Sequence, residues 1–236
     1  MYYYGFDIYY FILVIPAFLI AMIAQVGVKS TYKKYSARAN SRGLTGAMAA
    51  QAVLRFYGIE DVIIQPTAGT LTDNFNPSNK VISLSEGVYS SSTVAAVGIA
   101  CHEAGHAAQH ALGYKPIQVR NAIIPICNLG STLGLPIAIL GLFLTPYMPG
   151  FSFLIYVGLF LYAGVFVFHL VTLPVEFNAS RRALKVIKET DLLYNDEYDG
   201  AKKVLVAAAM TYVASMLVAL ANLLRLFLRF TRNNRN

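Results

Sequence analysis

One long stretch of the chain, from Asn121 to Val175, contains no Asp, Glu, Lys or Arg. A helix needs about 20 apolar residues to cross a lipid bilayer, so this stretch is long enough for two spans and a turn. The turn reads TPYMPG, from Thr145 to Gly150, and its two prolines and its glycine interrupt a helix. The sequence therefore predicts a membrane hairpin, with spans at about Ile123–Leu144 and Phe151–Leu173.

Two further apolar runs, at about Ile8–Val28 and Val204–Leu224, predict a first and a fourth span. The whole chain is 56% hydrophobic and only 13% Asp, Glu, Lys or Arg, whereas a soluble domain has about 25% charged residues. Its net charge of +7 lies on no basic helix interleaved with aromatic residues, which argues against nucleic acid as a partner. We therefore expect a mainly α integral membrane protein with about four transmembrane or membrane-associated helices.

Short basic clusters beside the apolar runs indicate the orientation in the membrane. The leading residues MYYYGFD carry no Lys or Arg, which argues against a cleavable signal peptide, whereas a basic cluster follows the first span: Lys29, Lys33, Lys34, Arg38 and Arg42. By the positive-inside rule the N-terminus faces outside, and the chain from residue 29 faces the cytoplasm. A basic tail after the last run, Arg225, Arg229, Arg232 and Arg235, breaks this rule if that run crosses. Crossing, re-entry and lying along the cytoplasmic face therefore stay open for it.

Residues 29–120 are the only sizeable stretch suited to water. A helix is expected over Thr45–Tyr57, because Thr45 or Ser41 can cap its start and Gly58 follows its end. DVIIQ, residues 61–65, is typical of a strand, and TLTDNF and KVISLS flank the turn NPSN as in a hairpin. SSST, residues 90–93, supplies N-caps for the next helix.

The sequence divides into five expected segments. They are an N-terminal anchor (1–28), a cytoplasmic α+β segment (29–120), the membrane hairpin (121–175), a cytoplasmic helix with an acidic loop (176–203), and a C-terminal membrane helix with its basic tail (204–236).

The helix after SSST carries the sequence IACHEAGHAAQH, from Ile99 to His110. His102 and His106 are four residues apart, so they lie on one face of a helix. With Glu103 they form the H-E-x-x-H arrangement of zinc proteases. Zinc held by the imidazoles would lower the pKa of its water toward 7, and Glu103 would take the proton as the water attacks a carbonyl. The alternative is that both histidines are ordinary core residues satisfied by hydrogen bonds. Glu103 would then need a partner of its own, because an unpaired buried charge is costly.

A catalytic zinc site normally has three protein ligands, so one remains to be found. Gln109 and Leu112 occupy the positions where metzincins need Gly and His, so that class is excluded. His110 is expected either at the surface or in contact with a metal ligand rather than with the metal. Glu176 is the first charge after the hairpin, in LPVEFNASRRAL, and could face the histidine pair. From the residues alone, it could equally begin a helix and interact with the helix dipole.

Four blocks occur in order along the chain: LTDNFNPSNKVISLSEGVY, VAAVGIACHEAGHAAQH, LPVEFNASRRAL and VLVAAAMTYVA. Together they resemble the bacterial neutral zinc metallopeptidases of the YugP type over nearly the whole chain. The resemblance implies a multi-pass zinc peptidase of the bacterial plasma membrane, distantly similar to HtpX-type and CaaX-prenyl proteases. It implies a zincin-like catalytic segment of the gluzincin kind, with one zinc ion per chain and Glu176 as the third ligand.

The resemblance also indicates where residues around the metal should lie. Many such proteases carry an Asp one turn beyond the ligand Glu, where it orients a histidine. Here that position is Ser180, with Asn178 before it, and either side chain could take the role. His169 is a further candidate, as a donor to the oxyanion, because ionisable residues inside a membrane are often functional. Tyr212, in the family-like TYVA, is another candidate for that role. A hydrogen bond between spans is the alternative for His169.

Substrate is expected along a strand edge, because such proteases commonly bind extended peptides by main-chain pairing. KVISLS, Lys80 to Ser85, directly precedes the metal helix, which makes Ile82, Ser83 and Leu84 candidate substrate-binding residues. The same alternation also fits an ordinary half-buried strand.

The predicted function is that of a membrane-embedded zinc endopeptidase with its active site at the cytoplasmic face. The alternative is a non-catalytic membrane scaffold or chaperone with a structural metal. Glu103 favours the enzyme, because a structural site has no need of a general base. The expected partners are the lipid bilayer and a peptide or protein substrate, soluble or membrane-bound, and the sequence does not specify an oligomeric state.

Overall fold

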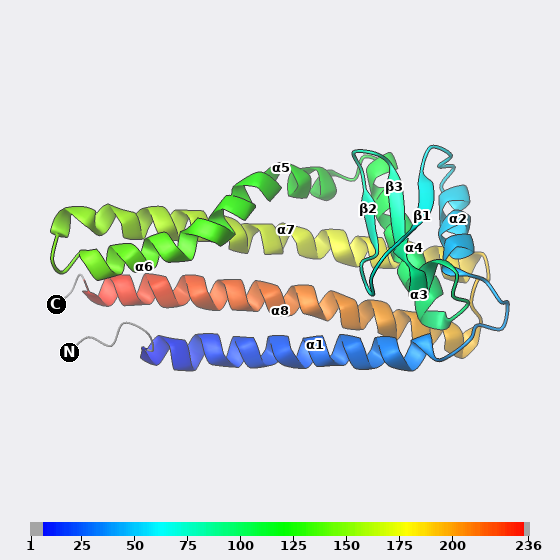
Figure 1. The fold of residues 1–236 in the computed structure, drawn as a ribbon, viewed down its shortest axis with the longest axis horizontal. Helices are drawn as coiled ribbons and strands as arrows, with labels where there is room; N and C mark the ends of the chain where they lie inside the picture. Colours follow the sequence, from blue (N-terminus) through cyan, green and yellow to red (C-terminus); the bar gives the residue numbers. More distant parts are fainter. Residues whose placement is uncertain (1–6, 234–236) are drawn as a thin grey trace. The chain divides into compact units, whose positions relative to one another are not determined.

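The computed structural model describes residues 7–233, which group into two compact units (Figure 1). Unit 1 takes the residues up to Ala24, Val119–Leu173, and the residues from Thr211 onward. Unit 2 takes Gln25–Gln118 and Pro174–Met210. Three long helices contribute residues to both units: α1 (Ile15–Ser36), α7 (Phe153–Glu189) and α8 (Asn195–Asn233).

Among residues 7–233, four helical stretches are long and apolar enough to cross a bilayer: Tyr10–Ser36, Lys115–Leu144, Pro149–Glu189 and Asn195–Arg229. The first opens with the π-helix η1 (Tyr10–Val14), and the third opens with the 3-10 helix η3 (Pro149–Ser152). The second joins α5 (Lys115–Leu129) to α6 (Leu135–Leu144) through the π-helix η2 (Gly130–Gly134). The expected fold class, a mainly α membrane protein with a small α+β segment, is confirmed.

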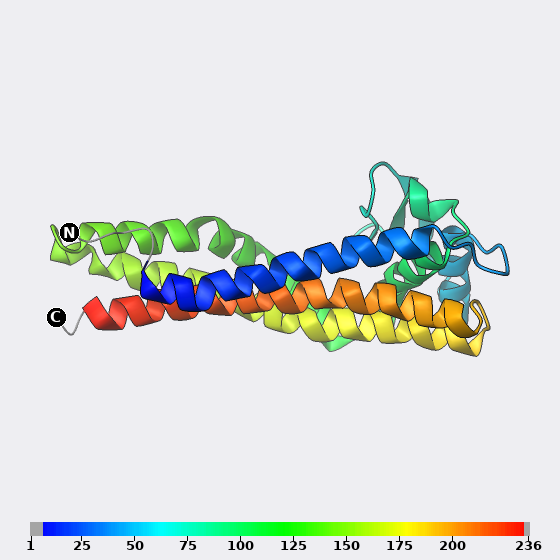
Figure 2. The same cartoon turned by 90° about the horizontal axis from the view of Figure 1, so that it is seen from below.

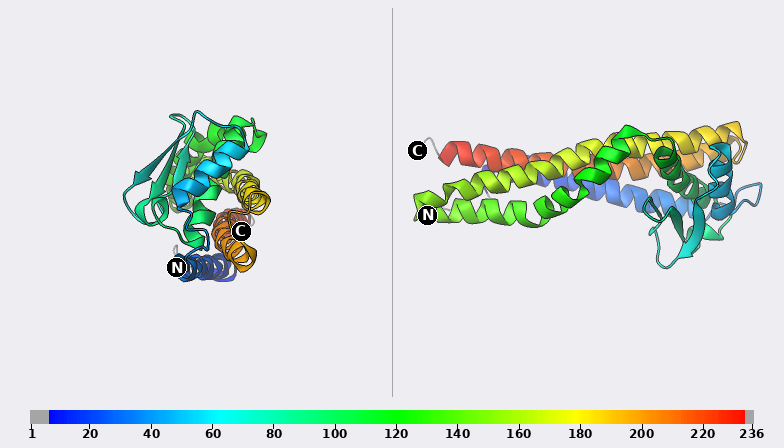
Figure 3. Two further views of the ribbon diagram at one scale, coloured as in Figure 1. Left: turned by 90° about the vertical axis from the view of Figure 1, so that its right-hand side faces the viewer. Right: turned by 90° about the horizontal axis from the view of Figure 1, so that it is seen from above.

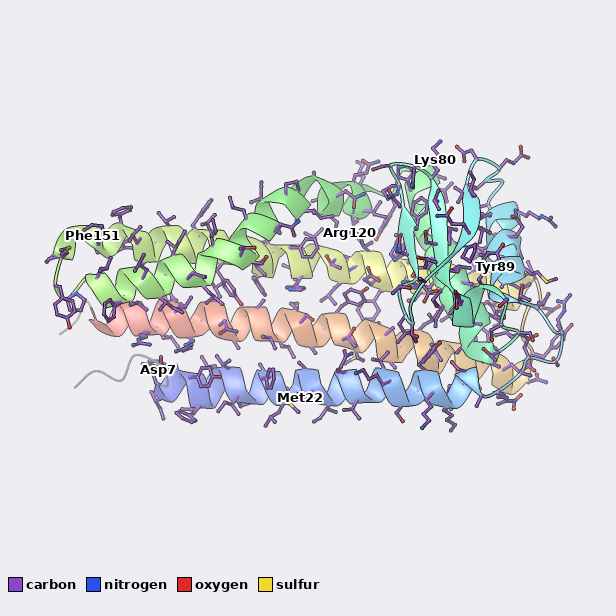
Figure 4. All side chains as sticks on the ribbon, viewed as in Figure 1. Asp7, Met22, Lys80, Tyr89, Arg120 and Phe151 are labelled. Atoms are coloured by element: carbon purple, nitrogen blue, oxygen red, sulfur yellow. The ribbon has the colours of Figure 1, made fainter. Side chains whose placement is uncertain are left out.

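The helices of unit 1 carry large apolar side chains on their outer surface. Phe160 is 80% exposed and Tyr147 is 73% exposed, and Figure 4 shows the labelled Met22 and Phe151 among the outward-pointing side chains. Water penalises contiguous apolar surface of this kind, whereas lipid tails solvate it. This surface therefore suits contact with lipid.

The two arms of the hairpin, α5–α6 and the first part of α7, approach closely at Gly130. A Cβ atom at Gly130 would lie 2.3 Å from the carbonyl oxygen of Leu161, so no other residue fits without moving the backbone. Small residues permit such close helix contacts in membranes, where dispersion rather than the hydrophobic effect holds helices together. Toward the turn, Ala138 and Ile155 are fully buried in a small apolar cluster.

The start of α1 and the end of α8 lie side by side in unit 1 (Figure 2). Asp7 Oδ2 accepts hydrogen bonds at 3.1 Å from Arg225 Nε and at 3.1 Å from Arg229 Nη1. Val14 and Ala221 are buried together beside these ion pairs. Of the three arrangements left open for the last apolar run, crossing is the one that this pairing favours, because it returns the end of α8 to the start of α1.

Unit 2 contains a three-stranded sheet of β1 (Ile63–Thr67), β2 (Asn74–Asn76) and β3 (Val81–Ser85), in the order β1-β3-β2. The hairpin predicted around NPSN is present as β2 and β3, which pair antiparallel. The strand expected at 61–65 begins two residues later, because Ile63 is the first residue in register with β3, to which β1 runs parallel. The strands form one side of the unit and its helices the other (Figure 3, left).

The core of unit 2 is formed by α2 (Gly46–Phe56) and α4 (Val94–Ala111), with the short α3 (Glu86–Tyr89) beside them. Both long helices begin at the predicted caps: the Thr45 hydroxyl accepts from Met48 N at 3.3 Å, and the Thr93 hydroxyl accepts from Ala96 N at 3.3 Å. Nearly all of α4 is buried, which explains its many small residues.

The expectation that a separate helix begins at Glu176 is wrong, because Glu176 belongs to the long helix α7. The helix continues through Pro174, and Glu176 lies in its interior. A proline lacks one main-chain donor and usually kinks or ends a helix. Here the helix continues beyond it, and fully buried Val175, Ala179 and Ala183 pack into unit 2. The interaction with a helix dipole is thereby excluded for Glu176, because that interaction acts only in the first turn.

Gly105 sets how closely α4 and α7 approach. A Cβ atom added there would lie 2.6 Å from the carbonyl oxygen of Ala179, a main-chain atom that no side-chain rotation can move. The fourth residue of HEAGH, Gly105, is therefore restricted to glycine by packing.

We expect Gly105→Ala to destabilise the protein by about 1–3 kcal/mol, the usual range for overpacking a core. Gly164→Ala is the matched control on α7, because a Cβ there meets nothing within 4 Å and alanine favours helix by about 1 kcal/mol. Thermal unfolding of both variants in detergent measures the difference. Equal stability of the two variants would show that α4 and α7 are not held at this distance.

Candidate metal centre

Three polar side chains of unit 2 converge between α4 and α7. His102 Nε2 lies 3.3 Å from Glu176 Oε2, and His106 Nε2 lies 3.5 Å from the same oxygen. One ligand atom from each residue lies within 4.8 Å of the others. The two imidazole rings meet edge to face, with centroids 4.7 Å apart. The structure thus brings together the three residues proposed as ligands from the sequence.

The donor set fits a zinc ion. Two neutral imidazoles and one carboxylate are a common catalytic set, and bonds of about 2.0–2.2 Å in a tetrahedron place neighbouring ligand atoms about 3.3–3.6 Å apart. The two measured distances to Glu176 Oε2, 3.3 and 3.5 Å, fall in this range. His106 and Glu176 are 8% and 3% exposed, so a cation between them would be largely shielded from water.

Each histidine has a hydrogen-bond partner on the side away from Glu176. Ser180 Oγ lies 3.1 Å from His102 Nδ1, at the position where similar proteases carry an Asp. Gln109 Oε1 lies 3.0 Å from His106 Nδ1. Such outer partners hold the rings of metal-binding histidines in place and leave their Nε2 atoms free to bind the metal ion.

Gln109 was not recognised from the sequence as a residue of this site, because there it was used only to exclude the metzincin class. It is fully buried, and its Nε2 donates to Val175 O at 2.8 Å and to Asn178 Oδ1 at 3.0 Å. Asn178 therefore contacts Gln109 rather than a histidine, and Arg182 Nε also donates to its Oδ1 at 2.8 Å. The available signal was a lone amide one turn after the second histidine on an otherwise small and apolar helix.

Glu103 lies beside the three converging residues and is outside that group. Burial raises the pKa of Glu103 to about 7; the carboxylates of Glu176 and Asp73 act in the same direction, and His102 opposes them. The main chain of Phe75, in β2, donates a hydrogen bond to its carboxylate. A carboxyl group with a pKa near neutrality can both accept and return a proton.

The expectation of a free strand edge at Lys80–Ser85 is wrong. β3 is the central strand: Ile82 and Ser83 pair with β1 on one side and with β2 on the other, and Leu84 pairs with β1. The main chains of Ile82 and Ser83 are therefore engaged on both sides within the sheet and cannot offer a peptide an open edge, and Leu84 is paired on the β1 side. The strand nearest Glu103 with one unpaired side is β2.

The remaining candidates lie away from this cluster or in the other unit. His110 is at the surface, as expected, with its ring 6.0 Å from that of Phe75. His169 and Tyr212 belong to unit 1, and their role as oxyanion donors stays a prediction.

Comparison with known proteins identifies the family of the chain. The family described as "Putative neutral zinc metallopeptidase" matches residues 10–231. A protein of Bacillus subtilis (strain 168) named "Putative membrane protease YugP" is 42% identical over 218 residues, which cover 92% of this chain and 95% of that protein. No solved structure matches the chain. The family match spans both helices that carry the converging residues, and the chain belongs to the neutral zinc metallopeptidase family.

Proposed function

We propose that this protein is a membrane-embedded zinc endopeptidase that hydrolyses peptide bonds in a peptide or protein substrate. One observation carries the proposal: His102, His106 and Glu176 converge at 3.3 and 3.5 Å, with the buried carboxylate of Glu103 beside them and not among the ligands. The family match supports the reaction class.

Each residue has a defined part in the reaction. His102, His106 and Glu176 hold the zinc ion, one per chain. When bound, zinc supplies Lewis-acid chemistry, which lowers the pKa of a water molecule and polarises the carbonyl of the scissile bond. Glu103 accepts a proton from the attacking water and then returns it to the departing amine.

The number of ligands favours an enzyme over a scaffold or chaperone with a structural metal. Structural zinc sites are normally closed by four protein ligands, whereas catalytic sites keep one position open. Among residues 7–233 the converging group contains three ligands. A general base beside an open position serves catalysis and adds nothing to a structural site.

The substrate would bind as an extended strand along β2, because the β2 edge away from β3 pairs with no described strand. The hydrogen bond from the Phe75 main chain to Glu103 supports this choice, since it ties β2 to the proposed base. Extended binding along a strand edge supplies affinity through main-chain hydrogen bonds.

The proposed location is a bacterial plasma membrane, with unit 2 on the cytoplasmic side. The support is the basic cluster after the first apolar run, which the positive-inside rule assigns to the cytoplasm: Lys29, Lys33, Lys34, Arg38 and Arg42. In this orientation the substrate is reached from the cytoplasm close to the bilayer.

Replacing the proposed base tests the reaction directly. We expect Glu103→Gln to keep its zinc and to lose at least about 100-fold in peptide hydrolysis, the scale typical of a positioned proton-transfer group. Zinc content by elemental analysis and cleavage of a peptide library, measured on the same purified sample, provide the comparison. Substantial cleavage by the zinc-loaded variant would overturn the assignment.

Replacing the proposed third ligand tests the metal site. We expect Glu176→Ala to lower zinc affinity by more than the about 10–100-fold typical of an outer partner, and to lower thermal stability because metal binding and folding are coupled. Glu189→Ala is the control on the same helix, since exposed Glu189 makes only a 4.0 Å pair with Lys185. Full zinc affinity in Glu176→Ala would place the third ligand elsewhere.

Cysteine labelling tests the orientation. With Cys101 and Cys127 replaced, single cysteines at Thr70 and Asn195 should resist a membrane-impermeant thiol reagent in intact cells, and one at Met148 should react. Thr70, Asn195 and Met148 are all exposed on the protein, so protection would report the membrane and not burial. Labelling at Thr70 would place unit 2 outside.

A further inference from the structure

We propose that Gln109 is a positioning residue that fixes His106 in the form with its proton on Nδ1, so that Nε2 faces Glu176 as a lone pair. The direction of the Gln109 amide is itself fixed by Val175 and Asn178. This inference deepens the proposed metal site and rests on it, but it concerns the hydrogen-bond donors and acceptors of the protein alone.

The hydrogen bond between His106 and Gln109 is ambiguous when taken alone. The two end atoms of a glutamine amide are nearly indistinguishable in shape, and each imidazole nitrogen can donate or accept. At 3.0 Å, the contact of Gln109 with His106 Nδ1 would therefore permit either tautomer. The tautomer must therefore be decided by neighbouring groups that can only donate or can only accept a hydrogen bond.

Two such groups contact the other end of the Gln109 amide. Val175 O, at 2.8 Å, is a main-chain carbonyl and can only accept. Asn178 Oδ1, at 3.0 Å, faces Arg182 Nε at 2.8 Å, and a guanidinium can only donate, so the Asn178 atom must be its oxygen. The end of Gln109 that faces two acceptors is therefore its NH₂ group.

The tautomer of His106 follows from this order. Because the NH₂ group of Gln109 is turned to Val175 and Asn178, its oxygen is turned to His106 Nδ1, which must donate. The neutral ring then carries its lone pair on Nε2, 3.5 Å from Glu176 Oε2. A lone pair and a carboxylate oxygen repel one another unless a cation lies between them, so this arrangement selects a metal ion or a proton.

His102 lacks such a constraint. Its Nδ1 partner is the hydroxyl of Ser180 at 3.1 Å, and a hydroxyl donates or accepts equally well. The two histidines are thus held differently. The tautomer of His106 is fixed by hydrogen bonds whose donors and acceptors cannot exchange roles, whereas either tautomer of His102 can pair with Ser180. The structure gives no such role to Asn178 alone, since it acts on His106 only through Gln109.

Gln109 also joins the two helices that carry the ligands. It lies in α4, three residues after His106, and it holds the main chain of α7 one residue before Glu176. It is fully buried, so its polar atoms have no water as an alternative. Removing it would leave the carbonyl of Val175 and the Nδ1 proton of His106 without this partner, which costs free energy at buried positions.

Nitrogen NMR of the metal-free protein tests the inference without any peptidase assay. The chain has four histidines, so histidine-selective ¹⁵N labelling gives few signals, and a His106→Asn variant assigns one of them. In the neutral ring, the ¹⁵N shifts should show the proton of His106 on Nδ1. In Gln109→Met, which keeps the length but loses the amide, the proton should move partly to Nε2.

Two further variants separate positioning from packing. Asn178→Asp keeps the acceptor for both Gln109 and Arg182, so the tautomer should be unchanged. Gln118→Met, at an exposed position, controls for the substitution itself. Zinc affinity by chelator competition should fall about 10–100-fold in Gln109→Met, the range for outer partners of a metal ligand, and should stay within about twofold in Gln118→Met.

A purely structural role for Gln109 would lower stability and leave the tautomer unchanged, and that result would overturn the proposal. A proton on Nε2 in the unaltered protein would overturn it as well. If Glu103→Gln proved active while the tautomer behaved as expected, the proposed reaction would fail and the role of Gln109 would stand.

Discussion

A buried carboxylate held against two imidazoles is the interaction on which unit 2 depends. Glu176 is 3% exposed, and its Oε2 lies 3.3 and 3.5 Å from the two histidine Nε2 atoms. Taking such a group out of water is unfavourable unless a positive charge compensates it, so α4 and α7 must meet at a fixed distance. Gly105 makes that distance possible, because any side chain there would strike the main chain of Ala179. For a metal held at the proposed site, affinity and folding stability would be coupled through this contact.

The composition of α4 follows from the same constraint. A helix buried on almost all sides can approach its neighbours only through small side chains, and alanine and glycine occupy half of its positions. Each polar side chain in its buried part then needs a specific partner. His102 has Ser180, His106 has Gln109, and Gln109 has Val175 and Asn178, all of them on α7 except Gln109 itself. The hydrogen bonds thus connect the two helices at the three converging residues.

The sequence predicts the parts of this protein that local chemistry determines. Charge-free runs identify the helices of unit 1, Thr45 and Thr93 mark helix starts, and the spacing of HEAGH places both histidines on one face. It does not predict the parallel pairing of β1 with β3, because that contact joins strands separated by β2 in the chain. It also fails at Pro174, where burial of the following turn outweighs a local helix breaker. The α4 sequence shows Gln109 as a lone amide but does not reveal its role, since two of its three partners lie on α7.

The ion pairs of Asp7 offer a physical reason for the basic end of α8. Arginines beyond a last span are unfavourable on the outer side of a membrane by the positive-inside rule, which is why the sequence alone leaves the crossing open. Asp7 lies just before η1 and accepts from Arg225 and Arg229 at 3.1 Å each, and the Arg225 guanidinium stacks on the Tyr10 ring at 4.8 Å. One carboxylate and one aromatic ring therefore compensate part of the charge that the rule penalises. In the proposed orientation, the arginines at the end of α8 depart from the positive-inside rule, and Asp7, before α1, neutralises part of their charge.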